Sequence, residues 1–329
     1  MVGASPGRAS QASNNPTPIL AGVTVTWDDD IDDIIGGDAA VGFASVTPAK
    51  GVVIMPMAPL GLRDREAGTV TITTSLGLPK KLVRLRQNPS VALAYHAREH
   101  GESSSPLYVV VQGTAAVDPQ PDRAWLDSIT PQWERFLGPR HTGVLGRLMH
   151  IYYWERVAIR IQVRRVLVHD GTSAPPRVIG EPLPAGEPES QTAPKGGTGP
   201  RVDTGKVAAH LDRLPHSLLG WVGSDGLPMV SRVRGAGVGE RGVRLVAQDG
   251  HLPPGNRRAG LTAHSFRRHM IGQEQRVHTG WLEVDGDEGV YAPHTKSGQA
   301  VPASRTLFAV GAGLAMRPGY KRAQKIGLA

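Results

Sequence analysis

The sequence contains no cysteine, few aromatic residues and no long hydrophobic run. The absence of cysteine excludes disulfide bonds, thiolate-bound metals, iron–sulfur clusters and a cysteine nucleophile, and it is compatible with a reducing cytoplasm. No segment approaches the roughly 18 apolar residues of a membrane-spanning helix, and residues 1–20 lack the apolar core of a secretion signal. We therefore expect a cytoplasmic protein with no membrane partner.

Glycine and proline are abundant, with 41 Gly and 27 Pro among 329 residues. This composition favours turns and short strands over long helices, and the length suggests about two domains. Residues 171–204 are rich in Pro and Gly and poor in apolar side chains, which is typical of a linker. The expected organisation is a disordered N-terminus (1–20), a first domain (21–170), this linker, and a second, basic domain (205–329).

The first domain has the two-residue apolar period of half-buried strands. Val70 and Ile72 alternate with threonines, for example, and five further segments between residues 42 and 168 are apolar enough to form strands. The last of them slips phase at Arg164 and Arg165, which predicts a β-bulge or a barrel corner. Six strands that close on themselves, with short helices at the ends, are the simplest architecture for this pattern.

The second domain partly repeats the first. Residues 221–231 resemble residues 43–56, and Gly280–Asp285 shares the pattern G-x-x-x-V-D with Gly113–Asp118. These matches predict a duplicated β-domain whose two copies pack against each other. The alternative is that two unrelated β-domains share ordinary strand–turn–strand patterns.

A stretch of hydroxyl and basic residues between a strand and a helix is the best candidate for a binding site. Thr73, Thr74 and Ser75 end the predicted strand, and Lys80 and Lys81 begin the helix. A lysine at a helix N-terminus opposes the helix dipole unless an anion binds there. Free helix N–H groups, hydroxyls and ammonium groups together form a phosphate site. A solvated basic helix is the alternative interpretation.

The order of motifs from Val41 to Val117 resembles the FMN-binding split barrel, and more narrowly the pyridoxamine 5′-phosphate oxidase-like proteins, including the flavin/deazaflavin-dependent oxidoreductases of actinobacteria. The motifs are T-T-S at residues 73–75, K-x-x-x-L-x-x-N-P at residues 81–89 and V-x-G-x-A at residues 111–115. The resemblance implies a mainly β fold with short helices, in which two tandem split β-barrel domains form an internal pseudo-dimer. A homodimer is the alternative assembly.

The resemblance also implies a site and an activity. Its cofactor-binding residues would be Lys81 as the phosphate lysine with Lys80 as its alternative, Thr73, Thr74 and Ser75 as donors, and Met55, Pro56 and Met57 beside the ring. The cofactor would be the deazaflavin F420 or FMN, and the activity an oxidoreductase that transfers hydride to or from an unknown small-molecule substrate. No catalytic residue is identified. His251 takes the place of the lysine in the second domain, so we expect one cofactor site per chain.

Two other functions remain open on the same fold. One is a haem-binding or haem-degrading protein, for which His264, His278 and His294 are candidate axial ligands because they lie in or near predicted strands. The other is a non-catalytic cofactor carrier. The pattern H-x-x-E-H at residues 96–100 matches a zinc-protease motif but follows a strand rather than lying on a helix, so we expect no metal site.

The positive charge is concentrated in the last third of the chain. Residues 201–329 contain 18 Lys and Arg against 10 Asp and Glu, and so carry the whole net charge of +8. No helix-turn-helix, zinc-finger or RNA-binding motif accompanies this charge, so we expect no nucleic-acid partner. A polyanionic small molecule such as the deazaflavin coenzyme fits the charge better.

Overall fold

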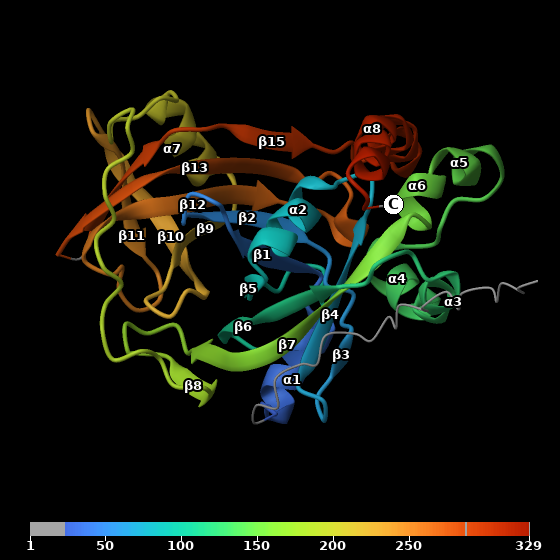
Figure 1. Ribbon diagram of the computed structural model, residues 1–329, viewed down its shortest axis with the longest axis horizontal. Helices are drawn as coiled ribbons and strands as arrows, with labels where there is room; N and C mark the ends of the chain where they lie inside the picture. The colour runs from blue at the N-terminus through green and yellow to red at the C-terminus, as the bar shows by residue number, and fades with distance from the viewer. Residues whose placement is uncertain (1–23, 287, 329) are drawn as a thin grey trace, which may run out of the picture.

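The computed structural model describes residues 24–286 and 288–328, and it consists of two β-sheet units with helices at their ends (Figure 1). The predicted mainly β fold is confirmed. The segment predicted to be disordered, residues 1–20, lies outside the described residues. None of the helices in the described part of the chain is long and apolar enough to cross a membrane.

The first unit is a curled antiparallel sheet that remains open along one seam. Its strands run in the order β2 (Val52–Met57), β1 (Ala40–Val46), β5 (Ser90–Ala97), β6 (Tyr108–Val117), β7 (Arg156–His169), β4 (Thr69–Ser75) and β3 (Arg63–Asp64), with β8 (Arg177–Gly180) beside β7. Among the described strands no pairing joins β2 to β4. Strand β3 covers β4 at Thr69 and Val70, and the remaining edge of β4 up to Ser75 has no described strand partner on that side.

Six helices accompany this sheet. They are α1 (Asp29–Gly37), α2 (Lys80–Gln87), α3 (Arg123–Ser128), α4 (Thr130–Leu137), α5 (Gly143–Leu148) and α6 (His150–Tyr153). Helix α2 follows β4 directly and buries Leu82 and Leu85, which are three residues apart and lie on one face. The segment from Thr73 to Lys81 is therefore fixed at both ends by the core.

The predicted bulge is confirmed. Gln112 of β6 pairs with Arg165 of β7, whereas Gly113 pairs with Val163, so that Arg164 is the extra residue. A Cβ atom at position 113 would collide with the carbonyl oxygen of Gln162, which explains glycine there. Because the bulge shifts the alternation by one residue, the Arg165 side chain turns inward and is 1% exposed.

The second unit is a closed six-stranded barrel. Its strands β9 (His216–Val222), β10 (Pro228–Gly239), β11 (Gly242–Ala247), β14 (Glu288–Pro293), β13 (Glu274–Asp285) and β12 (Gly255–Ser265) pair in that order, and β12 also pairs with β9, which closes the barrel. Helix α7 (Thr204–Arg213), the short helix η1 (Arg268–Met270) and strand β15 (Ser297–Ala300) complete it. The prediction of tandem barrels is confirmed.

The last helix of the chain, α8 (Arg305–Lys325), packs on the first unit although it follows the second in sequence. It contacts α5 and α6 (Figure 1). Gly77 and Gly319 approach so closely that a Cβ atom on Gly319 would collide with the carbonyl oxygen of Gly77. At the helix C-terminus, Ala323 and Leu328 are buried in the core of the first unit. The first unit is therefore completed by a helix that follows the second unit in sequence.

The interface between the units is mainly strand against strand. Strand β2 packs on β12 and β13, and β10 packs on β5. Several buried hydrogen bonds cross it. Among them, Tyr108 Oη donates to Val230 O at 2.7 Å, and Thr262 Oγ1 donates to Ile54 O at 2.8 Å. A shared apolar cluster includes Ile54 and Leu218. The predicted internal pseudo-dimer is confirmed.

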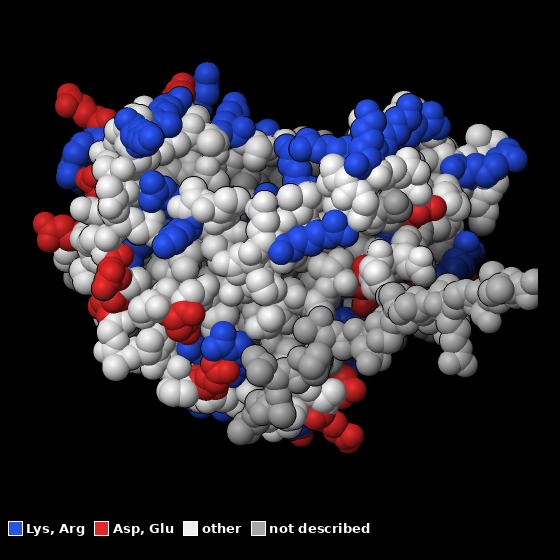
Figure 2. All heavy atoms as spheres, in the orientation of Figure 1, with Lys and Arg blue, Asp and Glu red and all other residues white. Residues whose placement is uncertain are grey.

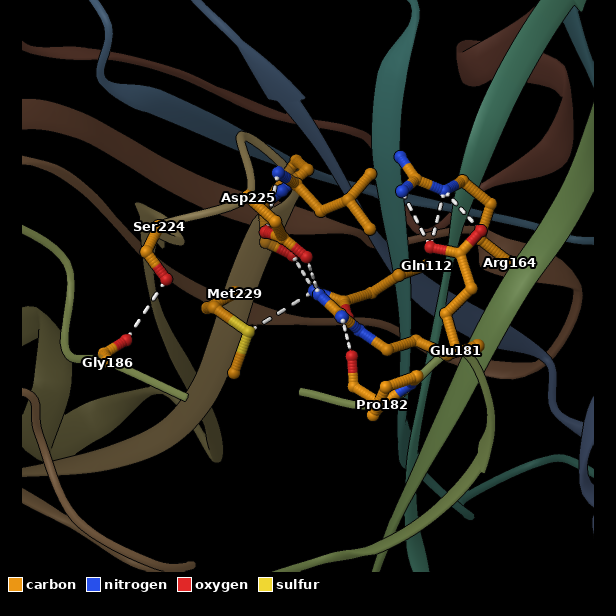
Figure 3. A network of polar contacts seen from close by, with 11 residues as sticks. Gln112, Arg164, Glu181, Pro182, Gly186, Ser224, Asp225 and Met229 are labelled. Atoms are coloured by element: carbon orange, nitrogen blue, oxygen red, sulfur yellow. Dashed lines mark hydrogen bonds and ion pairs between the residues drawn. The ribbon is translucent and has the colours of Figure 1, made fainter. Parts of the chain in front are cut away.

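A polar network around Arg165 also joins the two units. Arg165 donates to Gln112 Oε1 at 2.5 Å and to Pro182 O at 2.9 Å, and it forms an ion pair with Asp225. Figure 3 shows Gln112, Pro182 and Asp225 converging from β6, from the segment between the units and from the turn before β10. Ser224 Oγ of the second unit also donates to Gly186 O at 3.0 Å, so residues 171–203 contact both units directly.

Three histidine rings meet elsewhere in this interface. His96 of β5 packs against His216 of β9 and His264 of β12, with ring centroids 5.0 to 5.3 Å apart. His96 Nδ1 lies 2.8 Å from Ala94 O, and His96 Nε2 lies 2.7 Å from His264 Nε2. Because the carbonyl needs a donor, Nδ1 of His96 carries the proton, and His264 Nε2–H donates to His96. Both rings are thus neutral.

This pair predicts that the protein loses stability in acid. Burial lowers the pKa of His96 from 6.5 to about 3, and burial also lowers the pKa of His264. Between pH 6.5 and about 3 the unfolded chain binds more protons than the folded chain. The free energy of unfolding should therefore fall as the pH falls below 6.5, by up to about 1.4 kcal/mol per pH unit for each histidine.

Denaturant unfolding at pH 7.5 and 5.5 measures this effect. We expect a smaller pH dependence in a His96→Leu/His264→Leu variant than in the wild type. His150→Gln, at an exposed position on α6, serves as the control and should keep the wild-type dependence. Equal pH dependence in the double variant and the wild type would contradict the assignment.

Candidate functional site

A cavity of about 440 Å³ lies at the open seam of the first unit. Its walls come from β2, β4 and α2 of that unit, from residues 270–302 of the second unit, and from α8. A volume of this size is in the range of small-molecule and cofactor sites. The seam, the unit interface and α8 thus meet around one space.

Lys81 forms the basic end of this cavity. Its side chain is buried, and its Nζ atom lies 3.4 Å from Met57 Sδ. No carboxylate in the described part of the chain forms an ion pair with it. Burial, followed by the positive charges of Arg156 and Arg84, lowers the pKa of Lys81 to about 7. A buried ammonium group without a counter-charge is unfavourable by itself, and an anion in the cavity would relieve it.

Arg156 lies beside Lys81 and is also buried. It begins β7 opposite Ser75 of β4, so the strand register directs it to the seam. Its Nε and Nη2 atoms donate to Thr73 Oγ1 at 3.1 and 2.7 Å, and Nη1 donates to Tyr152 O at 2.9 Å. Burial lowers the pKa of Arg156 to about 10. Two fixed cations therefore share one wall.

The hydroxyl groups of the T-T-S motif have different roles. Thr73 accepts the hydrogen bonds of Arg156. Ser75 Oγ donates to Ile151 O at 2.8 Å and accepts from Gly77 N at 3.1 Å, which fixes the turn into α2. The buried Thr74 Oγ1 has no partner among the described residues, and Thr74 lines the cavity. The Thr74 hydroxyl is thus an unsatisfied buried donor in a residue of the cavity wall.

The other walls are mainly apolar but include three glutamines, Gln273, Gln275 and Gln299. Met55, Pro56 and Met57 line one side, and α8 lines another. Opposite them, Gln273 and Gln275 come from the second unit. Gln273 Nε2, a donor, and Gln275 Oε1, an acceptor, are buried without partners among the described residues. These two atoms are therefore a donor and an acceptor without described protein partners in side chains that line the cavity.

The structure brings most of the predicted site residues together. Seven line the cavity: Met55, Pro56, Met57, Thr73, Thr74, Ser75 and Lys81. Lys80 is exposed and does not line it. Sequence reasoning missed Arg156, Tyr152, Gln273, Gln275 and α8. Of these, only Arg156 could have been found from the sequence, because it is a charged residue directly before an apolar strand.

The second unit lacks an equivalent site in the described residues. No helix corresponding to α2 lies between β11 and β12. On β10, Arg232 pairs with Asp249 at 2.5 Å, and its guanidinium lies 4.9 Å from the ring centre of Tyr108. Arg232 lies two residues after Val230, which is the counterpart of Pro56 in the duplicated hairpin. It lines a separate pocket of about 330 Å³ together with His96, Arg98 and His216, and no described lysine lines that pocket.

The histidine candidates do not lie in the cavity. His96 lies in β5 and His100 in the following turn, so the H-x-x-E-H pattern is not helical. His264 belongs to the interface pair. His278 Nδ1 lies 3.1 Å from Thr295 O, and His294 Nε2 lies 3.3 Å from Thr198 O. Within the described residues, no group of three or more His, Asp or Glu could hold a metal ion.

Comparison with solved structures gives matches of low sequence identity. A conserved hypothetical protein from Mycobacterium tuberculosis is 21% identical over 44% of this chain and 86% of its own, with a TM-score of 0.33. A pyridoxamine 5′-phosphate oxidase-related, FMN-binding protein from Nostoc punctiforme is 10% identical over 43% of this chain and 78% of its own, with a TM-score of 0.29. A heme binding protein from Mycobacterium smegmatis is 14% identical over 92% of this chain and 100% of its own, with a TM-score of 0.30.

No protein-family model and no curated protein matches the chain. All three TM-scores are low, so the strand order described above decides the fold. The chain is a tandem split barrel. In this tandem split barrel the first copy is open and has a cavity at its seam, whereas the second copy is closed.

Proposed function

We propose that the protein binds one phosphorylated flavin-type cofactor, FMN or the deazaflavin F420, in the seam cavity and uses it to transfer hydride to or from a small molecule. The observation that carries the proposal is the pair of buried cations, Lys81 and Arg156, that have no counter-charge among the described residues and face a cavity of about 440 Å³. The sequence resemblance implies the same class of ligand.

Lys81, Arg156 and Thr74 would hold the phosphate. The two cations supply charge-assisted hydrogen bonds, and the free Thr74 hydroxyl supplies a neutral one. Thr73 already accepts from Arg156 and therefore positions the guanidinium instead of binding the ligand. Arg156 is also held by Tyr152 O, so the basic wall is largely formed before a ligand enters.

Met55, Pro56 and Met57 would lie against one face of the ring, because β2 presents them along the cavity wall. Gln273 Nε2 and Gln275 Oε1 offer one donor and one acceptor, which match a ring carbonyl and a ring N–H of a flavin-type pyrimidine. The first unit thus contributes charge and apolar contacts to cofactor binding, and the second unit contributes hydrogen bonds.

Once bound, a flavin-type ring itself supplies the hydride chemistry, and the protein supplies orientation, charge and exclusion of water. Phe308, Ala312 and Met316 of α8 cover the apolar side and would keep water from the ring. This division of labour explains why no acid–base pair is conspicuous in the cavity.

Haem and a non-catalytic carrier function are the alternatives. The described residues that line the cavity include no histidine, so a haem there would depend on methionine or lysine for axial ligation. A carrier would bind the same cofactor but show no turnover with a reductant and an acceptor. Both alternatives give distinct results in the following experiment.

We expect the purified protein to bind FMN or F420 with a stoichiometry of one per chain. Absorption spectra after addition of FMN, F420 or haemin identify the ligand, and calorimetry gives the stoichiometry. A Soret band with haemin and no change with either flavin would replace the proposal by the haem alternative. Two equivalent flavin sites per chain would contradict the assignment of the second unit as empty.

A further inference from the structure

Helix α8 has an exposed face that the proposed function does not use. Six residues of α8 follow one another at intervals of three or four positions. Because an α-helix turns by about 100° per residue, their side chains lie within an arc of roughly 80°. They are Leu307, Val310, Leu314, Arg317, Lys321 and Lys325, and all six are exposed. The buried residues of α8, such as Ala312 and Met316, lie on the opposite side. The exposed face is thus distinct from the cavity wall.

The first half of this face is aliphatic. Leu307 is 62% exposed, Leu314 is 53% exposed and Val310 is 40% exposed. Together they account for three of the seven large hydrophobic side chains that are exposed in the described residues, and they adjoin one another on one helix. Scattered apolar residues on a surface need no explanation, but a contiguous group indicates an interaction site.

The second half of the face is basic. Helix α8 contains five Lys and Arg residues and no Asp or Glu. Figure 2 shows basic side chains gathered over α8, at the upper right of the molecule. A partner that accepts both halves of the face must be negatively charged and must also take up aliphatic side chains.

The cavity opens beside this face. Gly311 and Ala315 line the cavity and are exposed, and Leu78, which also lines it, is 39% exposed. Gly77 packs against Met316, so the loop that carries Leu78 is held next to α8. The aliphatic group therefore borders the mouth of the cavity.

We propose that the α8 face docks the protein on an anionic membrane surface, with the cavity mouth turned towards the lipid. Leu307, Val310 and Leu314 enter the boundary of the acyl chains, and Arg317, Lys321 and Lys325 contact the phosphate headgroups. A nucleic acid fits this face less well, because the face offers no aromatic side chain for stacking. The proposal adds a surface partner to the proposed function and departs from the expectation drawn from the sequence, which was that the protein has no membrane partner.

Docking at the mouth also restricts the substrate class. When the protein is docked, a molecule that enters the cavity through its mouth comes from the acyl-chain region of the membrane and passes Leu78 and α8. The substrate is therefore an apolar molecule that dissolves in the membrane. This step rests on the proposed function, whereas docking itself does not.

Co-sedimentation of the full-length protein with vesicles tests docking. We expect at least tenfold more protein on phosphatidylglycerol/phosphatidylcholine vesicles than on pure phosphatidylcholine, with loss of this difference at 0.5 M NaCl. Leu307→Ser/Leu314→Ser and Arg317→Gln/Lys321→Gln should each reduce binding to the anionic vesicles at least fivefold. None of these four residues lines the cavity, so FMN or F420 affinity without vesicles should stay unchanged.

The second unit offers matched controls. Arg234→Gln/Arg244→Gln removes the same charge from exposed positions on β10 and β11, and Val238→Ser removes a side chain that is 47% exposed. Both controls should bind vesicles like the wild type. If the α8 variants and the control variants lost vesicle binding equally, net charge alone would explain the binding and the proposal would be wrong. Equal binding of the wild type to both kinds of vesicle would also contradict the proposal. Vesicle binding without cofactor binding would refute the proposed function alone.

Discussion

Replacement of Lys81 by Met should weaken cofactor binding at least tenfold and, at the same time, stabilise the protein without cofactor. The loss of affinity follows from one charge-assisted hydrogen bond to phosphate, worth about 1.5–3 kcal/mol. The gain in stability follows from burial, which lowers the pKa of Lys81 from 10.5 to about 7. Replacing buried ionic groups by apolar side chains of similar volume can raise the free energy of unfolding by about 1–4 kcal/mol, and Met has nearly the length of Lys.

The sign of the pH dependence follows from the same shift. The pKa of Lys81 is lower in the folded protein than in the unfolded chain. Buried Lys81 therefore lowers the free energy of unfolding by its full amount below pH 7, and this effect disappears as the pH rises from about 7 to 10.5. A bound phosphate would hold Lys81 protonated, so affinity should decrease between pH 7.5 and 9 in the wild type and not in Lys81→Met.

Calorimetric titration and thermal unfolding at pH 7 measure both effects of Lys81→Met. Lys80→Met is the matched control, because this neighbour begins the same helix but is exposed and does not line the cavity. It should change neither quantity appreciably. If Lys80→Met instead gave the tenfold loss and Lys81→Met did not, Lys80 would be the phosphate lysine.

Replacement of Arg165 by Met should destabilise the protein by about 3–5 kcal/mol, because it leaves buried partners of an ion-pair network unsatisfied. Gln112 and Pro182 would each lose a hydrogen bond, and Asp225 would lose its counter-charge. Since these residues belong to both units and to the segment between them, we also expect the thermal transition to broaden or to divide into two.

Arg164 provides the control for this experiment. It is adjacent in sequence and forms a salt bridge with Glu181 at 2.6 Å, but both side chains are partly exposed (Figure 3). Arg164→Met should therefore change the free energy of unfolding by at most about 1 kcal/mol. Similar effects of the two substitutions in denaturant unfolding would show that the Arg165 network is not important for the interface.

Local patterns were sufficient to predict the strands and one side of the site. The alternation of Val70 and Ile72 predicted β4, and the phase slip at Arg164 predicted the bulge, because both depend on residues close in sequence. The T-T-S motif and Lys81 lie on one strand–turn–helix segment, so their proximity also follows from the local chain. Lys80 could not be separated from Lys81, because burial decides between adjacent lysines and is a property of the whole fold.

The remaining half of the cavity could not be predicted, since it depends on long-range packing. Gln273 and Gln275 reach the cavity only because β13 packs on β2. Helix α8 contains Gly311, Gly313, Pro318 and Gly319, which disfavour a helix locally and conceal it from pattern analysis. Tertiary packing explains the glycines at 313 and 319, because side chains at these positions would collide with Leu148 and with Gly77, respectively.

The position of α8 after the second unit sets an order of events during synthesis. Strand β4 ends at Ser75, whereas α8 begins at Arg305, after every strand of both barrels. The basic wall is complete only after Arg156, which begins β7 and precedes Arg305 by 149 residues. At about 5–20 residues per second, the finished wall leaves the ribosome roughly 7–30 s before the helix that covers it. The nascent first barrel therefore exposes Lys81, Arg156 and the apolar seam during this interval, which makes the unfinished chain a natural client for chaperones and leaves the cofactor to bind after translation.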